Sequence, residues 1–238
     1  MKLYDDENAL FEFFGFNNRL WQDERQKTVE NAKELKPDAV LARVNRVKNS
    51  HRGIRAFTGV EELLAGSVNQ DFLDEICALP NLKVLFMGYP VTAMDLSGLS
   101  ALENLHTLKI DSPRNITDFS VLAKMPNLRT LFVENAKHLR DLDFLSDAHH
   151  LRVIGVEGDM STNQKVTSLQ PLSGLKSLEA LFMRSVQLAD KDLTYLSECK
   201  KLRLLFCARF APKKSFEALQ TMMPNLDCAW FDKYEINV

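Results

Sequence analysis

The 238-residue chain is poor in the features that mark several common classes of protein. Its 9 glycines and 8 prolines are too few for collagen-like segments, glycine-rich phosphate loops or long flexible linkers. No apolar run approaches the roughly 18 residues of a membrane span. The start, MKLYDDENAL, is acidic where a secretory signal has a basic stretch and then an apolar run.

Excess charge and paired cysteines are missing as well. The 30 Lys and Arg nearly balance the 32 Asp and Glu, so no overall field favours nucleic acid or an anionic membrane as a partner. The four cysteines, Cys77, Cys199, Cys207 and Cys228, form no CxxC pair and lie in apolar periodic segments. Such thiols fit a reducing compartment better than a disulfide framework. We therefore expect a globular cytoplasmic protein.

Leucine, in contrast, is abundant: 36 residues are leucine, and 31 of them follow residue 59. They recur as L-x-x-L-x-L, with substitutions, at spacings of 22–27 residues. The eight copies have their three positions at Val60/Leu63/Ala65, Leu82/Leu85/Met87, Leu105/Leu108/Ile110, Leu128/Leu131/Val133, Leu151/Ile154/Val156, Leu178/Leu181/Met183, Leu202/Leu205/Cys207 and Leu226/Ala229/Phe231. Each copy predicts one short strand that cannot bury its apolar face alone.

Between these copies, apolar residues recur every three positions, as in Leu96, Leu99 and Leu102. A period of three suits 3₁₀ turns, because side chains at i and i+3 eclipse there. The segments ADKDLTYLSE and SFEALQTMM instead predict short α-helices. Each strand is therefore expected to be followed by a turn and a return segment.

The segments ITDFSVLAKMPNLRTLFV and VTSLQPLSGLKSLEALFM resemble leucine-rich repeats of the short, 22–24-residue class, which occurs in bacterial internalins and protein-phosphatase regulators. The resemblance covers about residues 60–238. It implies an α/β fold, a leucine-rich-repeat solenoid with a curved parallel β-sheet on its concave side and 3₁₀ or short α-helical segments on its convex side. The asparagine that the family carries after each strand is absent, and residues such as Pro90 and Pro113 stand there instead.

The first 59 residues carry no repeat. We expect residues 1–59 to form a helical N-terminal capping segment and residues 60–238 a solenoid of about eight repeats, because a solenoid needs a polar-faced end. The segment DERQKTVENAKEL predicts a charged helix that stops before Pro37, whereas AVLARVNRV fits a strand or a helix. The alternative for this region is a separate small effector-binding element.

Alternate residues of a strand point to opposite faces, so the residue between two core positions faces the concave side. This column reads Phe86, Lys109, Phe132, Gly155, Phe182, Phe206 and Trp230. Two residues later, an acidic stretch contains Asp111, Glu134 and Glu157. The position after each leading leucine gives a basic row that contains Lys83, Arg129, Arg152 and Arg203.

A large aromatic side chain buries about 150–250 Å². Five in one column would expose more apolar surface than a monomer normally leaves bare. The column therefore predicts a groove that binds another protein. Its contact residues would be Phe86, Phe132, Phe182, Phe206 and Trp230, with Lys109, Asp111, Glu134, Glu157, Arg129 and Arg152 setting register and orientation. Alternatively, the N-terminal segment folds across the stripe, or the aromatics cap the end of the solenoid.

Catalytic and metal-binding motifs are missing: the chain has no GxSxG elbow, Walker loop, GxGxxG, HExxH or calcium loop. Only Cys228, placed on the concave side, offers a reachable thiol for an enzyme. We therefore expect a non-catalytic protein that binds another protein and needs no cofactor or metal. Two alternatives remain: an inhibitor or immunity-type protein, or a module that forms a homodimer through the same aromatic stripe.

Overall fold

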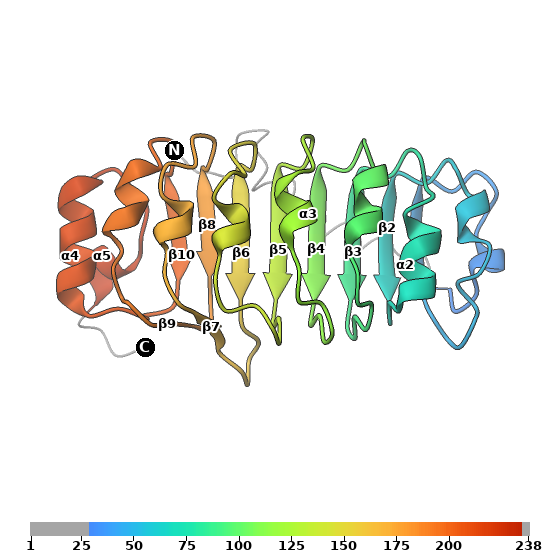
Figure 1. The fold of residues 1–238 in the computed structure, drawn as a ribbon, viewed down its shortest axis with the longest axis horizontal. Coiled ribbons are helices and arrows are strands. Elements are labelled where there is room, and N and C mark those ends of the chain that lie inside the picture. Colours follow the sequence, from blue (N-terminus) through green and yellow to red (C-terminus); the bar gives the residue numbers. More distant parts are fainter. Residues whose placement is uncertain (1–28, 235–238) are drawn as a thin grey trace. The chain divides into compact units, whose positions relative to one another are not determined.

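Short parallel strands alternate with 3₁₀ turns and short helices along residues 29–234, the part of the chain that the computed structural model describes (Figure 1). This chain divides into two compact units. The first runs to Leu131 and includes Ala136–His138, and the second contains Phe132–Asn135 and the chain from Leu139 onward. Within residues 29–234, no helix has both the length and the apolar character needed to cross a membrane.

In the first unit, each strand pairs in parallel with the next along the chain. The strands are β1 (Leu41–Asn45), β2 (Glu62–Gly66), β3 (Val84–Gly88) and β4 (Thr107–Asp111). The turns and helices between them are η1 (Ala32–Glu34), η2 (Ile54–Ala56), α2 (Gln70–Ile76), η3 (Ser97–Ala101) and α3 (Ser120–Ala123). Pairing follows the leucine register, since Leu63 pairs with Leu85 and Leu85 with Leu108.

In the second unit, β8 pairs in parallel with β6 on one side and β10 on the other, and β7 pairs with β9 in a separate two-stranded sheet. The strands are β6 (Val153–Glu157), β7 (Gln164–Val166), β8 (Ala180–Met183), β9 (Val186–Leu188) and β10 (Leu204–Cys207). The turns and helices are η4 (Asp143–Leu145), η5 (Gln170–Leu172), η6 (Thr194–Glu198), α4 (Lys213–Met222) and α5 (Trp230–Lys233). Strand β5 (Thr130–Glu134) spans the division between the two units.

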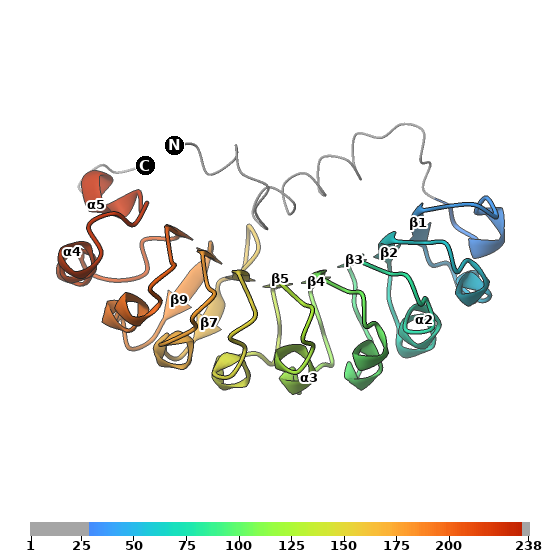
Figure 2. The ribbon, with the colours of Figure 1, turned by 90° about the horizontal axis from the view of Figure 1, so that it is seen from above.

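The core of each unit lies between its strands and its return segments (Figure 2). Leu85, Leu108 and Leu181, three of the repeated strand positions, are at most 1% exposed. The period-three positions are buried opposite them, as at Leu99, Leu122 and Leu145. The turns η3, η4 and η5 confirm the expected 3₁₀ geometry in three of these segments, whereas the segment around Leu122 forms the short α-helix α3. Helix α4 confirms the helix predicted in SFEALQTMM, whereas ADKDLTYLSE forms the 3₁₀ turn η6 instead of an α-helix.

Asparagines reinforce the loops that lead into the strands of the first unit. Asn81, Asn104 and Asn127 each stand one position before a leading leucine, and each side-chain amide donates to a backbone carbonyl of the preceding repeat at 2.8–2.9 Å. The asparagine that the family carries after each strand is absent here. An equivalent backbone ladder therefore lies at the opposite end of these strands.

The described part of the expected capping segment contributes a strand to the sheet. AVLARVNRV contains β1, and Val29 extends the pairing, since its N–H donates to Arg43 O at 2.9 Å. The predicted charged helix is represented in the described chain by the 3₁₀ turn η1, and its first residues lie outside the described range. The sheet thus begins before residue 60, and a capping role for residues 1–59 stays a prediction.

The eighth repeat differs from its prediction. Leu226 is buried, but the strand expected at Leu226/Ala229/Phe231 is replaced by an isolated bridge between Leu204 and Asp227 and then by helix α5. Ala229 is exposed, so this copy lacks its second core position. The chain leaves the sheet because the residues after Cys228 adopt helical backbone angles.

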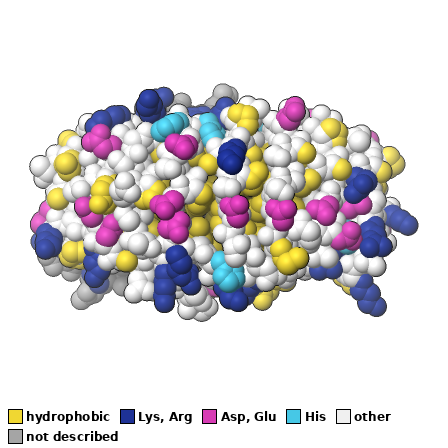
Figure 3. Space-filling view, in the orientation of Figure 1, with side chains coloured by type: hydrophobic (Ala, Val, Ile, Leu, Met, Phe, Trp, Pro, Cys, Tyr) yellow, Lys and Arg dark blue, Asp and Glu magenta, His cyan; other side chains and the backbone are white. Residues whose placement is uncertain are grey.

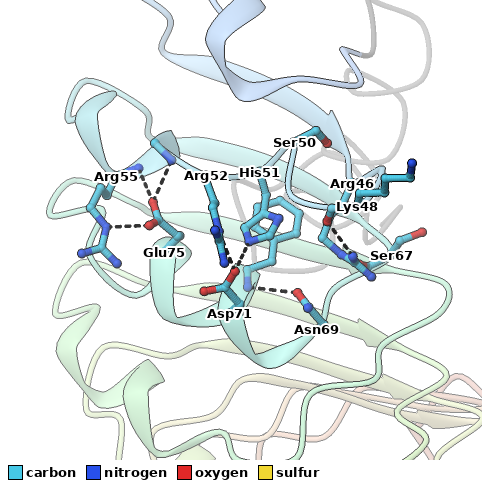
Figure 4. A network of polar contacts seen from close by, with 12 residues as sticks. Arg46, Lys48, Ser50, His51, Arg52, Arg55, Ser67, Asn69, Asp71 and Glu75 are labelled. Atoms are coloured by element: carbon cyan, nitrogen blue, oxygen red, sulfur yellow. Dashed lines mark hydrogen bonds and ion pairs between the residues drawn. The ribbon is translucent and has the colours of Figure 1, made fainter.

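A buried histidine ties the loop after β1 to helix α2 (Figure 4). The His51 side chain is completely buried, lies 5.1 Å from the Phe72 ring between ring centres, and has Nε2 2.9 Å from Asp71 Oδ2. Hydrogen bonds from His51 and then Arg52 hold the pKa of Asp71 below its usual value. Nearby, Arg55 and Glu75 form a second ion pair at 3.0 Å. This network joins two successive repeats at the start of the described chain.

We expect His51→Phe to lower the free energy of unfolding by about 1–3 kcal/mol, because phenylalanine fills the space but cannot bond Asp71. Urea unfolding followed by circular dichroism measures this change. The same substitution at exposed His149 is the matched control and should leave stability nearly unchanged. Equal stability of the two variants would contradict a stabilising role for the network.

Acidic side chains recur along the middle of the face formed by the return segments (Figure 3). Several open a return segment by accepting a backbone hydrogen bond two residues ahead. Asp95 Oδ1 accepts from Ser97 N and Asp118 Oδ1 from Ser120 N, both at 2.8 Å. These hydrogen bonds lower the pKa of both carboxyl groups, because they stabilise the charged form.

Each of these carboxyl groups has a lower pKa in the folded protein than in the unfolded chain, where it is about 3.9. The hydrogen bond therefore stabilises the fold fully at pH values above about 3.9, and this stabilisation is lost as the pH falls through the pKa of the folded state. We therefore expect the Asp118→Ala variant to have a lower Tm than the wild type at pH 7. Near pH 3 the Tm of the variant should approach that of the wild type. Differential scanning calorimetry across this range checks the effect. Asp141→Ala removes an exposed carboxylate without this hydrogen bond, and an identical pH dependence in both variants would refute the explanation.

Candidate protein-binding face

The sheet face opposite the return segments, here called the strand face, carries an aromatic stack in the second unit. The Phe132 and Phe182 ring centres are 5.3 Å apart, and those of Phe182 and Phe206 are 5.9 Å apart. Register pairs Gly155 with Phe182 and Phe182 with Phe206, so these residues do form one column. The tilts of 47° and 51° between ring planes suit favourable aromatic packing.

Gly155 makes this stack possible. A Cβ at this position would lie 2.8 Å from Phe132 Cγ and closer still to other atoms of the ring. The Phe132 ring therefore occupies the space that a side chain of β6 would fill, and from there it reaches Phe182. The glycine, which interrupts the column in the sequence, allows the rings to touch.

Most rings of this stripe are covered, as the alternative of a shielded column predicts. Phe132, Phe182 and Phe86 are only 1%, 3% and 7% exposed, whereas Phe206 is 48% exposed. For Phe132 and Phe182, mutual stacking and the space at Gly155 supply part of the burial. The other expected cover, the N-terminal segment, falls mainly on residues 1–28 and lies outside the described residues.

An ion pair between a buried carboxylate and an exposed arginine flanks the exposed end of the stack. Glu157 is 2% exposed, and the Arg184 guanidinium donates to both of its carboxylate oxygens, at 2.6 and 2.9 Å. This bonding raises the pKa of Arg184. The same guanidinium carbon lies 5.8 Å from the centre of the Phe206 ring. Glu157, expected in an accessible acidic rim, thus anchors Arg184 over Phe206.

Trp230 does not continue the column as a strand residue. It opens helix α5, is half-buried, and donates from Nε1 to Cys207 O at 2.8 Å, at the end of β10. Arg209 lies over both Trp230 and Tyr234, with its guanidinium carbon 5.9 and 5.5 Å from the two ring centres. Trp230 therefore closes the end of the strand next to Phe206.

In the first unit, the strand face is lined by a smaller apolar cluster. Val84 and Phe86 are buried there and pack with Leu41 and Leu64. Lys109, the register partner of Phe86, places its Nζ 5.0 Å from the centre of the Phe86 ring. Asp111 accepts a hydrogen bond from Ser112 Oγ at 2.7 Å. The structure thus brings Phe86 and Lys109 together, as the column predicted.

The basic row is largely neutralised by carboxylates. In the second unit, Glu179 bonds both Arg152, at 2.7 Å, and Arg203, at 3.0 Å. Burial raises the pKa of Glu179, but the two arginines outweigh this and lower it. In the first unit, Lys83 pairs with Glu61 at 2.8 Å, and Arg129 donates to backbone carbonyls of its own loop. The row therefore stabilises loops more than it presents free charge.

The expected reachable thiol is buried. Cys228 is 6% exposed and lies against Cys207, whose hydrogen bond lowers the pKa of Cys228, whereas burial raises the pKa of Cys207 well above its usual value. Within residues 29–234, no group of three or more His, Cys, Asp and Glu side chains is placed to hold a metal ion. The geometry at Cys228 therefore supports packing, not surface chemistry.

Glu134, another residue of the predicted acidic column, also acts on Arg184. The charge of Glu134 adds to the effect of Glu157 on the pKa of Arg184, so these two members of the predicted acidic column do lie near this arginine.

Arg209 was not among the predicted contact residues, because it stands one residue beyond the last column that the repeat register defines. Its position between Phe206 and Phe210, in an aromatic-rich stretch, was the available signal.

Comparison with known proteins agrees with this architecture. No protein-family model and no curated protein sequence matches the chain. Internalin C2 from Listeria monocytogenes is 20% identical, with a TM-score of 0.51 over 66% of this chain and 74% of that one. A leucine-rich-repeat protein from Leptospira interrogans is also 20% identical, with a TM-score of 0.54 over 85% of this chain and 57% of that one. By fold, the chain is a leucine-rich-repeat protein.

A third similar structure is the complex of TLR13 with the single-stranded RNA ssRNA13. The chain is 17% identical to it, with a TM-score of 0.52, and spans 24% of its length. At these identities the similarity concerns the fold. Leucine-rich-repeat scaffolds are typically protein-binding modules and are generally non-catalytic. The repeats therefore provide a rigid support for the strand-face side chains.

We expect Gly155→Ala to destabilise the protein by about 1–3 kcal/mol, because the added methyl group displaces the Phe132 ring. Phe132→Ala alone should cost about 3–5 kcal/mol. The double variant should lose less than the sum of the two, since removing the ring removes the clash. Chemical denaturation measures all three.

Gly88→Ala is the matched control, because a Cβ there meets its nearest atoms at 3.6 and 3.9 Å, which is ordinary contact. It should change stability little. Strict additivity of the Gly155 and Phe132 substitutions would show that the two positions do not interact.

Proposed function

We propose that this leucine-rich-repeat protein is a non-catalytic scaffold that binds another protein through its strand face. The observation that supports this most directly is the exposure of Phe206, a large aromatic residue of strand β10. Phe206 is 48% exposed, whereas the two rings stacked behind it, Phe182 and Phe132, are buried. Exposed apolar surface on a rigid element commonly marks an interaction site. Arg184 and Trp230 beside it are residue types enriched at binding hot spots.

In this proposal, some residues contact the partner and others hold the contacting residues in place. Phe206, Arg184 and Trp230 contact the partner, whereas Phe132 and Phe182 hold Phe206 in place through the stack. In the first unit, Phe86 and Lys109 occupy the corresponding positions, with Asp111 at the end of the same strand. Because the strands hold these side chains in fixed positions, little conformational entropy is lost on binding.

Residues outside the two clusters have supporting roles. Glu157 and Glu134 orient Arg184, and Arg129 and Arg152 stabilise the loops that lead into the strands. Residues 1–59 form the N-terminal cap in this proposal. The four cysteines are free thiols, which supports a reducing compartment such as the cytoplasm.

The proposal is tested by affinity capture from the native host, comparing wild type with Phe206→Glu by quantitative mass spectrometry. A charge at Phe206 should lower recovery of the bound protein at least tenfold, because it cannot be desolvated against an apolar partner surface. Met222→Glu, which changes an exposed residue of α4, is the matched control and should recover the same protein as wild type.

Thermal unfolding must show that both variants remain folded. Recovery of the same protein by Phe206→Glu and wild type would refute binding through this part of the strand face. Light scattering on the purified chains tests the remaining alternative: a dimer of wild type that Phe206→Glu dissociates would show that the bound partner is a second copy.

A further inference from the structure

Two arginines lie over aromatic rings at the end of the second unit. We name Phe206, Arg184, Arg209, Trp230 and Tyr234 the aromatic–arginine cluster. Arg184 lies over Phe206 at 5.8 Å, and Arg209 lies over Trp230 and Tyr234 at 5.9 and 5.5 Å, measured from guanidinium carbon to ring centre. At such distances the ring electrons attract the cation.

Hydrogen bonds to the backbone fix two of these rings. Trp230 Nε1 donates to Cys207 O at 2.8 Å, and Tyr234 Oη donates to Ala211 O at 3.0 Å. Tyr234 also packs against Phe216 of α4, with ring centres 5.7 Å apart. The platform under Arg209 is therefore preorganised, and a ligand that binds Arg209 does not have to order it.

Arg209 differs from Arg152, Arg184 and Arg203 in its charge balance. Arg184 is paired with Glu157, and Arg152 and Arg203 share Glu179. Among the described residues, Arg209 has no carboxylate within ion-pair distance, and its guanidinium donates to Tyr234 O at 3.2 Å. A guanidinium carries five N–H donors in a planar fork that matches a carboxylate. Arg209 is also exposed, so donors remain for a ligand.

The surrounding chain adds positive charge. Residues 200–234 contain seven Lys and Arg against three Asp and Glu, and two of these cations, Lys200 and Arg203, are paired with Glu198 and Glu179, which precede the segment. Lys214 at the start of α4 and Lys233 in α5 are exposed. A local positive potential of this kind attracts acidic partners and speeds their association.

An aromatic surface with positive charge can also serve nucleic acid, but two of the three rings here lie under Arg209, which leaves Phe206 as the one ring of the cluster with a large exposed surface. Single-stranded nucleic acid binds by stacking its bases on open aromatic faces. Arg184 lies over Phe206, and Arg209 lies over Trp230 and Tyr234. The exposed half of Phe206 and the free donors of Arg209 instead suit an apolar side chain next to a carboxylate.

We infer that the aromatic–arginine cluster binds an acidic protein segment, which places an apolar side chain against Phe206 and a carboxylate on Arg209. The inference rests on the proposed function and deepens it, since it names the chemistry of the partner and the part of the strand face that it occupies.

Selection from a phage-displayed library of random 12-residue peptides against the full chain tests this. Enriched peptides should be acidic and carry an apolar or aromatic residue. The most enriched one is then synthesised with a fluorescent label, and its Kd is measured by anisotropy. We expect Phe206→Ala and Arg209→Glu each to weaken binding at least tenfold, and added salt to weaken it further.

Arg140→Glu makes the same charge change at an exposed arginine outside the cluster and should bind like wild type. Arg209→Lys keeps the charge but loses the fork, so it should bind more weakly than wild type. Thermal unfolding confirms that each variant is folded.

Several outcomes would overturn the inference: no enrichment, enrichment of neutral or basic peptides, or wild-type affinity in Phe206→Ala and Arg209→Glu. Tighter binding of a labelled 12-nucleotide oligouridine than of the selected peptide would also overturn it, in favour of nucleic acid. Host capture that depends on Phe206, combined with peptides that are not acidic, would reject this inference and leave the proposed function standing. The reverse result, acidic peptides that depend on Phe206 with host capture unchanged, would reject the proposed function instead.

Discussion

Burial of one repeat's leucine face by the next repeat is the interaction on which this structure depends. A single strand with its return segment has apolar side chains that it cannot cover by itself. Parallel pairing places Leu63 beside Leu85 and Leu85 beside Leu108, so each repeat completes the core of its neighbour. The hydrogen bonds from Asn81, Asn104 and Asn127 connect the same repeats through their loops. With the leucines committed to this core, the residues on the opposite face of the sheet are not set by the leucine repeat.

In the second unit, the residues on that opposite face differ in how far they are exposed. Phe132 and Phe182 are buried and contribute to stability, whereas Phe206 is half exposed and free to contact a partner. Glu157 and Arg184 show the same division, because a carboxylate that is 2% exposed holds a guanidinium over the exposed ring. For the proposed protein-binding role, side chains that are held in this way have little conformational entropy left to lose on binding.

The sequence allowed the fold to be predicted because the leucine period is simple and long. Strand register, the buried positions and most 3₁₀ turns follow from it, and the pairing of Phe86 with Lys109 and of Phe182 with Phe206 confirms the predicted columns. The site could be predicted only in part. Exposure depends on contacts between side chains, and the space that Gly155 leaves for Phe132 is invisible in a pattern of residue types. The ends were predicted only in part, since the segment that contains β1 lacks the repeat and fitted a strand or a helix, and Trp230 lies in a helix where the repeat predicts a strand.

Helix α5 has a consequence for how this protein behaves among copies of itself. A sheet built from equivalent repeats offers, at its last strand, a row of backbone groups that another strand can extend. Here Leu205 N–H is taken by Asp227 O at 2.9 Å, and Cys207 O is taken by the Trp230 indole at 2.8 Å. The chain then turns into a helix, which cannot pair with a strand. These two backbone groups of β10 are therefore already bonded within the chain, which disfavours pairing of this edge with a strand of another copy.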